Sequence, residues 1–151
     1  MAETLLEDFT CVDLTGEKLI GIDMEATSND PLVAKPVLFQ IATKDRSYVV
    51  DVRGKSLEPM RGILEDPGIV KVIQNAAWEY KMLKHLFDIE LQTVFDTMLA
   101  ELILNTGITR ECSLEHLARI YLKKSLNKSI RWLFPISPTI TEEMVKYARE
   151  D

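Results

Sequence analysis

Two carboxylates alternate along one apolar segment of the chain. Asp23 and Glu25 stand at positions i and i+2 of residues 19–25, which otherwise have the composition of a buried strand. Alternate residues of a strand share one face of a sheet, so both acids point the same way. Two like charges in apolar surroundings raise the free energy unless a positive group lies between them, and a divalent metal ion is the simplest candidate. An edge strand that exposes both acids to water is the alternative.

Two further acids are expected on the apolar faces of helices. At about 100° per residue, Glu79 falls inside the apolar arc of a predicted helix over 76–87, between Leu83 and Leu86. Asp151 falls one turn beyond Tyr147, on the apolar face of the last helix. Carboxylates are rarely buried without a partner, and no Arg or Lys is evident on these faces. Metal ions would balance four inward-facing acids.

Turn signals and hydrophobic periodicity predict a mixed α/β sheet that positions these acids. Residues 19–25 form its central strand, the next two strands form an antiparallel meander beside it, and 69–73 lies parallel on its other side. The expected strands cover 9–14, 19–25, 37–42, 48–52, 69–73 and 91–95, and the expected helices cover 57–64, 76–87, 96–104 and 113–122, before a last helix capped by Thr141.

Composition limits the class of protein. The 151 residues, 46% apolar and 28% charged, fit one α/β domain with a buried core. The net charge of -6 argues against a broad basic face for nucleic acid, although an acidic site that recruits cations can still act on a polyanion. Cys11 and Cys112 form neither a zinc motif nor a disulfide framework, and neither a signal peptide nor a membrane-spanning run is evident. We expect a cytoplasmic protein with no membrane partner.

Three motifs give the chain a resemblance to a known family. In chain order they are Asp23-x-Glu25, Asn75 followed by Glu79, and Tyr147 followed by Asp151. The chain resembles the DEDD 3'-5' exonucleases of the DnaQ/RNase H-like superfamily, in the tyrosine-bearing DEDDy subgroup that includes RNase D and the proofreading domains of family-A DNA polymerases. Residues 126–129, followed by Trp132, are similar to the basic segment that precedes the third motif.

The resemblance implies an RNase H-like fold, in which a mixed β-sheet is flanked by helices. It also implies hydrolysis of phosphodiester bonds at the single-stranded 3' end of DNA or RNA with two Mg²⁺ or Mn²⁺ ions. In that scheme the acids and the tyrosine have distinct roles: Asp23 bridges both ions, Glu25 and Asp151 hold the first, Glu79 helps to hold the second, and Tyr147 orients the attacking water. Asn75, Met24 and Lys128 would contact the substrate.

Several of these residues also have a purely structural interpretation. Tyr147 can be a core aromatic residue, and Asn75 can cap a helix. Asp96 is predicted to be a helix N-cap and His85 a solvated surface residue. Trp78 and Trp132 are predicted to be packing groups. The basic run Lys123, Lys124, Lys128 and Arg131 is either a solvated surface or a track for phosphates.

The second motif departs from the family pattern, because position 79 is Glu where Asp is usual. The extra methylene leaves three hypotheses: a working exonuclease, a weakened or inactive domain that serves as a nucleic-acid-binding or interdomain scaffold, and an unrelated α/β domain whose acids are structural. Residues 1–151 are expected to form a single domain cut at its C-terminus from a longer protein, with a polymerase or another domain of that chain as its partner.

Overall fold

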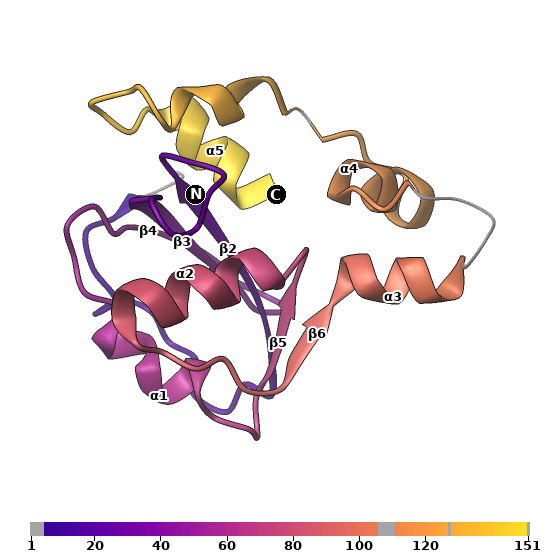
Figure 1. The fold of residues 1–151 in the computed structure, drawn as a ribbon, viewed down its shortest axis with the longest axis horizontal. Helices are drawn as coiled ribbons and strands as arrows, with labels where there is room; N and C mark the ends of the chain where they lie inside the picture. Colours follow the sequence, from indigo (N-terminus) through magenta and orange to yellow (C-terminus); the bar gives the residue numbers. More distant parts are fainter. Residues whose placement is uncertain (1–4, 106–110, 127, 151) are drawn as a thin grey trace.

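The protein folds around a six-stranded mixed sheet (Figure 1). The structure, a computed structural model, describes residues 5–105, 111–126 and 128–150. The strand order across the sheet is β1-β4-β3-β2-β5-β6. The strands are β1 (Leu5–Leu6), β2 (Leu19–Ala26), β3 (Pro36–Ala42), β4 (Ser47–Asp51), β5 (Val70–Ile73) and β6 (Val94–Asp96).

Strand β2 is central, as the sequence predicted. It pairs antiparallel with β3, which in turn pairs antiparallel with β4. On its other side β2 pairs parallel with β5. The short turns allow the antiparallel meander, whereas a parallel partner requires the longer helical crossover between β4 and β5. The edge-strand alternative is therefore wrong, because β2 has a partner on each side.

Helices cover both faces of the sheet. On one face, Ile22 and Met24 of β2 share an apolar core with Met82 and Leu83. On the opposite face, Leu38 of β3 belongs to a second core that includes residues of the last helix. The helices are η1 (Glu58–Met60), α1 (Arg61–Leu64), α2 (Ala77–Phe87), α3 (Thr97–Leu104), α4 (Leu114–Leu117), η2 (Ala118–Leu122), η3 (Lys128–Leu133) and α5 (Glu142–Glu150). None of the described helices is long and apolar enough to cross a membrane.

Helices α3 and α4 extend beyond β6, away from α1 and α2 (Figure 1). Helix α4 begins at the predicted cap Ser113, whose Oγ accepts from the backbone N–H of His116, and it widens into the π-helical segment η2. Helix α5 begins after the predicted cap Thr141, whose Oγ1 accepts from Met144 N at 3.3 Å. Its predicted apolar face is confirmed, because Met144 and Tyr147 are buried.

Two predictions about the fold are wrong. Residues 9–14 form turns in place of a strand, because the Asp8 carboxylate accepts from Thr10 N and the Phe9 carbonyl accepts from Val12 N. The first strand is β1, which pairs parallel with β4. Trp132 was predicted to be a packing group, but 63% of its surface is exposed, whereas Ile130 and Leu133 of η3 pack against the second core. Trp78 does pack against the core, and its Nε1 donates to Asn29 O at 2.8 Å.

Candidate active site

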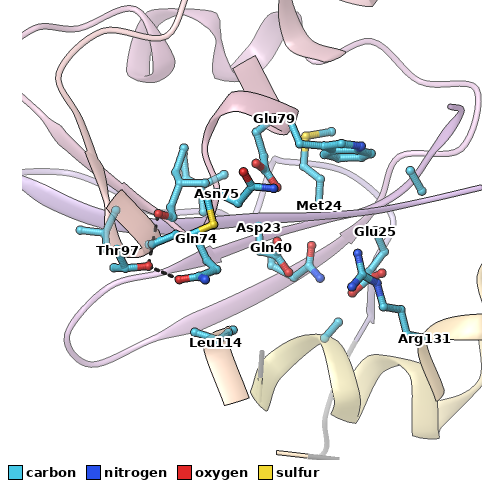
Figure 2. A pocket seen from close by; sticks show the side chains of 18 of the residues that line it. Asp23, Met24, Glu25, Gln40, Gln74, Asn75, Glu79, Thr97, Leu114 and Arg131 are labelled. Atoms are coloured by element: carbon cyan, nitrogen blue, oxygen red, sulfur yellow. Dashed lines mark hydrogen bonds between the residues drawn. The ribbon is translucent and has the colours of Figure 1, made fainter. Parts of the chain in front are cut away.

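Predicted acidic residues line a cavity of about 1060 Å³, called the acidic cavity below (Figure 2). Strands β2 and β3, the end of β5 and the first turn of α2 form its floor. The last turns of α5 and the segment before α4 form its walls. Three of the four predicted acids line it, Asp23, Glu25 and Glu79, together with Glu111 and Glu115 from the segment around the start of α4. The fourth, Asp151, lies outside the described residues.

Asp23 and Glu25 project from the face of β2 opposite to its apolar core residues. Asp23 pairs with Gln40 across the β2–β3 ladder, and Glu25 pairs with Leu38. Glu25 is only 6% exposed, so its carboxylate lies largely out of water. The alternation of strand side chains thus places two carboxylates on one buried wall of the cavity, as the sequence predicted.

Glu79 is a strongly perturbed acid of the cavity. It lies in the first turn of α2, it is 4% exposed, and its Oε2 has no hydrogen-bond partner in the described part of the chain. Burial and then the negative charges of Asp23 and Asp96 raise its pKa to about 8, and the charge of Arg131 opposes this rise. Figure 2 shows the Glu79 carboxylate beside Asn75, directed towards the strand that carries Asp23. Such a carboxylate is stabilised by a cation or by a proton.

The start of α2 is fixed by Asp96. Asn75 adopts a left-handed conformation (φ 61°), which Asn tolerates better than most residues. Its N–H and that of Ala76 donate to the two oxygens of Asp96, at 3.1 and 2.9 Å. The same carboxylate caps α3 by accepting from Met98 N and Leu99 N. The predicted N-cap at Asp96 is therefore confirmed, whereas Asn75 does not cap α2, whose N-cap is Ala76.

We expect Asp96→Ala to lower the free energy of unfolding by about 2 to 4 kcal/mol, because four backbone N–H groups lose their acceptor. Asp96→Asn keeps one acceptor oxygen and should lose about half as much. Urea denaturation measures both changes. Asp45→Ala, in the exposed turn between β3 and β4, serves as the control. Equal stabilities for Asp96→Ala and Asp45→Ala would contradict this role of Asp96.

Gln40 also lines the acidic cavity, and the sequence analysis did not single it out. It is 6% exposed, and neither its Nε2 nor its Oε1 has a hydrogen-bond partner in the described structure. A buried polar group without a partner costs about 1 to 3 kcal/mol. A single Gln within the apolar run of 37–42 is the one signal that could have singled it out.

The remaining predicted residues lie in different surroundings. Met24 and Asn75 line the acidic cavity. Tyr147, a residue of α5, is buried in the second core, with its ring centroid 5.9 Å from that of Phe134. The side chain of Lys128 lies outside the described structure. His85 is exposed, as predicted.

Arg131 brings a positive charge to the rim of the acidic cavity. Its side chain is exposed, it lines the cavity, and Figure 2 shows it pointing towards Glu25. Arg131 is therefore the one residue of the predicted basic run whose described side chain lines the acidic cavity. Within the described ranges, no group of three or more Asp, Glu, His or Cys side chains lies close enough together to hold a metal ion.

The mixed sheet with helices on both faces, and the paired acids of its central strand, define an RNase H-like exonuclease fold. The chain belongs to the 3'-5' exonuclease family, whose sequence profile matches residues 2–151. The hypothesis of an unrelated α/β domain is therefore wrong.

Known relatives agree with this assignment. Exosome complex component 10 of Rattus norvegicus is 33% identical over 143 residues, which cover 89% of this chain and 16% of the relative. Ribonuclease D of Gluconacetobacter diazotrophicus is 27% identical over 98% of this chain and 38% of its own. The structure of Brucella melitensis NrnC with bound Mg²⁺ superimposes with a TM-score of 0.83 at 21% identity, over 97% of this chain and 72% of the other. The chain thus spans well under half of these two curated relatives.

Proposed function

We propose that this chain hydrolyses phosphodiester bonds from the single-stranded 3' end of DNA or RNA, and that it uses two divalent cations, Mg²⁺ or Mn²⁺. One observation carries the proposal: the buried Glu79 carboxylate, with an oxygen that lacks a partner in the described structure, shares a cavity with Asp23 and Glu25. Three carboxylates around one cavity form a site that gains stability from cations.

The donor set fits Mg²⁺ or Mn²⁺. Carboxylate oxygens suit these hard ions, whereas zinc prefers His or Cys. Asp23, Glu25, Glu79 and Asp151 would hold them. When bound, such ions lower the pKa of a water molecule and stabilise negative charge on the leaving oxygen. NrnC, which has the same fold, has been solved with Mg²⁺, and this supports the choice of cation.

The other residues of the site would handle the substrate and the water. Tyr147 precedes Asp151 by one helical turn and would orient the attacking water. Asn75 and Met24, which line the cavity near Glu79, would contact the terminal nucleotide, and Lys128 would contact the strand behind it. Arg131, at the rim beside Glu25, would neutralise phosphate charge as the strand enters.

A domain without activity is the second candidate, and Glu at position 79 favours it. Such a domain would keep the fold and the strand-binding surface but would not cleave. It would act as a scaffold within a longer chain, for instance beside a polymerase domain.

A degradation assay with single-stranded oligonucleotides labelled at either end separates these candidates. With Mg²⁺ or Mn²⁺, a 3'-labelled strand should release labelled mononucleotide from the start of the reaction, whereas a 5'-labelled strand should shorten stepwise. EDTA should stop both. DNA and RNA strands of one sequence identify the preferred sugar. Binding without cleavage under every condition would favour the scaffold.

A further inference from the structure

Gln40 lies next to Asp23, and its other neighbours within the sheet are apolar. The two residues are partners across the β2–β3 ladder. Its other neighbours on this face of the sheet itself are Leu38 and Ala42 along β3 and Val49 on β4, and all three are apolar. Figure 2 shows the carboxamide beside the Asp23 side chain.

A second carboxamide in the acidic cavity shows that Gln40 is unusual. Gln74 Nε2 donates to Cys112 O at 2.8 Å, and Gln74 Oε1 accepts from Thr97 Oγ1 at 2.5 Å. Gln74 therefore connects the end of β5 to two other segments and has a structural role. Gln40, at 6% exposure, makes no such bond at either end within the described structure. Buried side-chain amides without any partner are rare in native proteins, so the partner of Gln40 is expected to come from the cavity.

The chemistry of the cavity indicates which partner this is. Whatever meets Gln40 also lies next to the Asp23 carboxylate, which is an acceptor and a cation ligand in the proposed function. Mg²⁺ in proteins usually keeps several of its water molecules. A water bound to a cation donates hydrogen bonds, and a carboxamide oxygen accepts them. Such contacts around metal ligands fix the coordination shell.

We propose that Gln40 is a positioning residue for the cation at Asp23: its Oε1 accepts a hydrogen bond from a water molecule bound to that ion. This inference rests on the proposed function. Gln40 does not touch the reacting atoms, and it acts by holding the hydrated ion in place. The rival role is direct contact with a phosphate of the substrate through Nε2.

The test measures Mn²⁺ binding by calorimetry in the absence of nucleic acid, so that a contact with phosphate cannot contribute. Gln40→Leu should bind Mn²⁺ about 10- to 100-fold more weakly than the wild type, which is the usual effect of losing a contact to the coordination shell. Gln40→Glu keeps an acceptor oxygen and should bind at least as well as the wild type. Gln92→Leu, at an exposed glutamine, should change nothing.

Two further measurements distinguish positioning from folding. The melting temperature of metal-free Gln40→Leu should equal or exceed that of the wild type, because a buried amide without a partner has been removed. Its cleavage rate should recover at high Mg²⁺ concentration, which a misfolded site would not do.

The outcomes separate this inference from the proposed function. If the wild type binds Mn²⁺, Asp23→Asn abolishes binding and Gln40→Leu binds normally, the role of Gln40 is overturned and the proposed function stands. If Gln40→Leu raises only the KM for the oligonucleotide, Gln40 contacts a phosphate of the substrate and does not position the cation. A wild type that binds no cation overturns both.

Discussion

Without divalent cations, the protein should lose stability as the pH rises from about 4.5 to about 8, and Glu79→Gln should remove most of that loss. Burial and the charge of Asp23 raise the pKa of Glu79 from 4.5 to about 8 in the folded state. Between these values the folded protein retains a proton that the unfolded chain releases. The contribution of Glu79 is therefore fully favourable below the unfolded pKa, and it disappears as the pH passes the folded pKa.

The expected slope is at most about 1.4 kcal/mol per pH unit, which corresponds to one proton. Urea denaturation in EDTA at intervals between pH 5 and pH 9 measures it for the wild type and for Glu79→Gln. The difference between the two proteins isolates residue 79, because other groups titrate in both. Asp13, whose pKa is lowered to about 2 by hydrogen bonds from Thr15 and Arg46, affects stability at acid pH in the opposite sense. Identical slopes in the two proteins would show that Glu79 is ionised normally.

Mg²⁺ or Mn²⁺ at millimolar concentration should counteract this loss. A ligand that binds only the folded state stabilises it in proportion to the logarithm of its concentration. Because the cation competes with the proton for carboxylates such as Glu79, the rise in melting temperature should be larger at pH 8 than at pH 6. Asp23→Asn should remove most of the rise. A melting temperature that is indifferent to the cation at both pH values would mean that the acids of the cavity are structural.

Local sequence patterns were sufficient for the centre of the fold. The alternation in 19–25 and the short turns after it identified β2, β3 and β4, and the helical period placed Glu79 on a buried face. The prediction failed at 9–14, a short half-apolar segment in which the turn contacts of Asp8 and Phe9 dominate. Strand β1 was missed because Leu5–Leu6 is too short to carry a periodic pattern.

The supporting residues of the site were harder to predict, because their hydrogen bonds and burial depend on which segments lie beside them. The capping pattern at Asp96 is local, but its two bonds to Asn75 and Ala76 require β6 to pair with β5. Gln40 looks like an ordinary strand residue until the pairing of β2 with β3 places Asp23 next to it. Sequence reasoning identified acids by their charge, whereas the residues that hold them are identified by tertiary contacts.

Glu79→Asp should accelerate cleavage of the 3' end, by up to on the order of a hundredfold. If the acids form one site, the extra methylene of Glu79 displaces its carboxylate but leaves its charge the same as that of Asp. A displacement of about 1 Å can lower the rate by about a hundredfold. The wild type should be slow and more active with Mn²⁺ than with Mg²⁺, because Mg²⁺ demands near-ideal octahedral geometry. Single-turnover cleavage of a labelled oligonucleotide measures each rate.

Two control variants make the result specific to the acidic cavity. Glu101 is also a helical glutamate with 4% exposure, but it lies outside the acidic cavity, and its carboxylate accepts hydrogen bonds from Tyr121 and Asn105. Glu101→Asp should therefore lower stability without accelerating cleavage. Asp23→Ala should abolish cleavage in either background. A folded Glu79→Asp protein that stays inert with both cations would favour the scaffold, because the family's usual acid would have restored nothing.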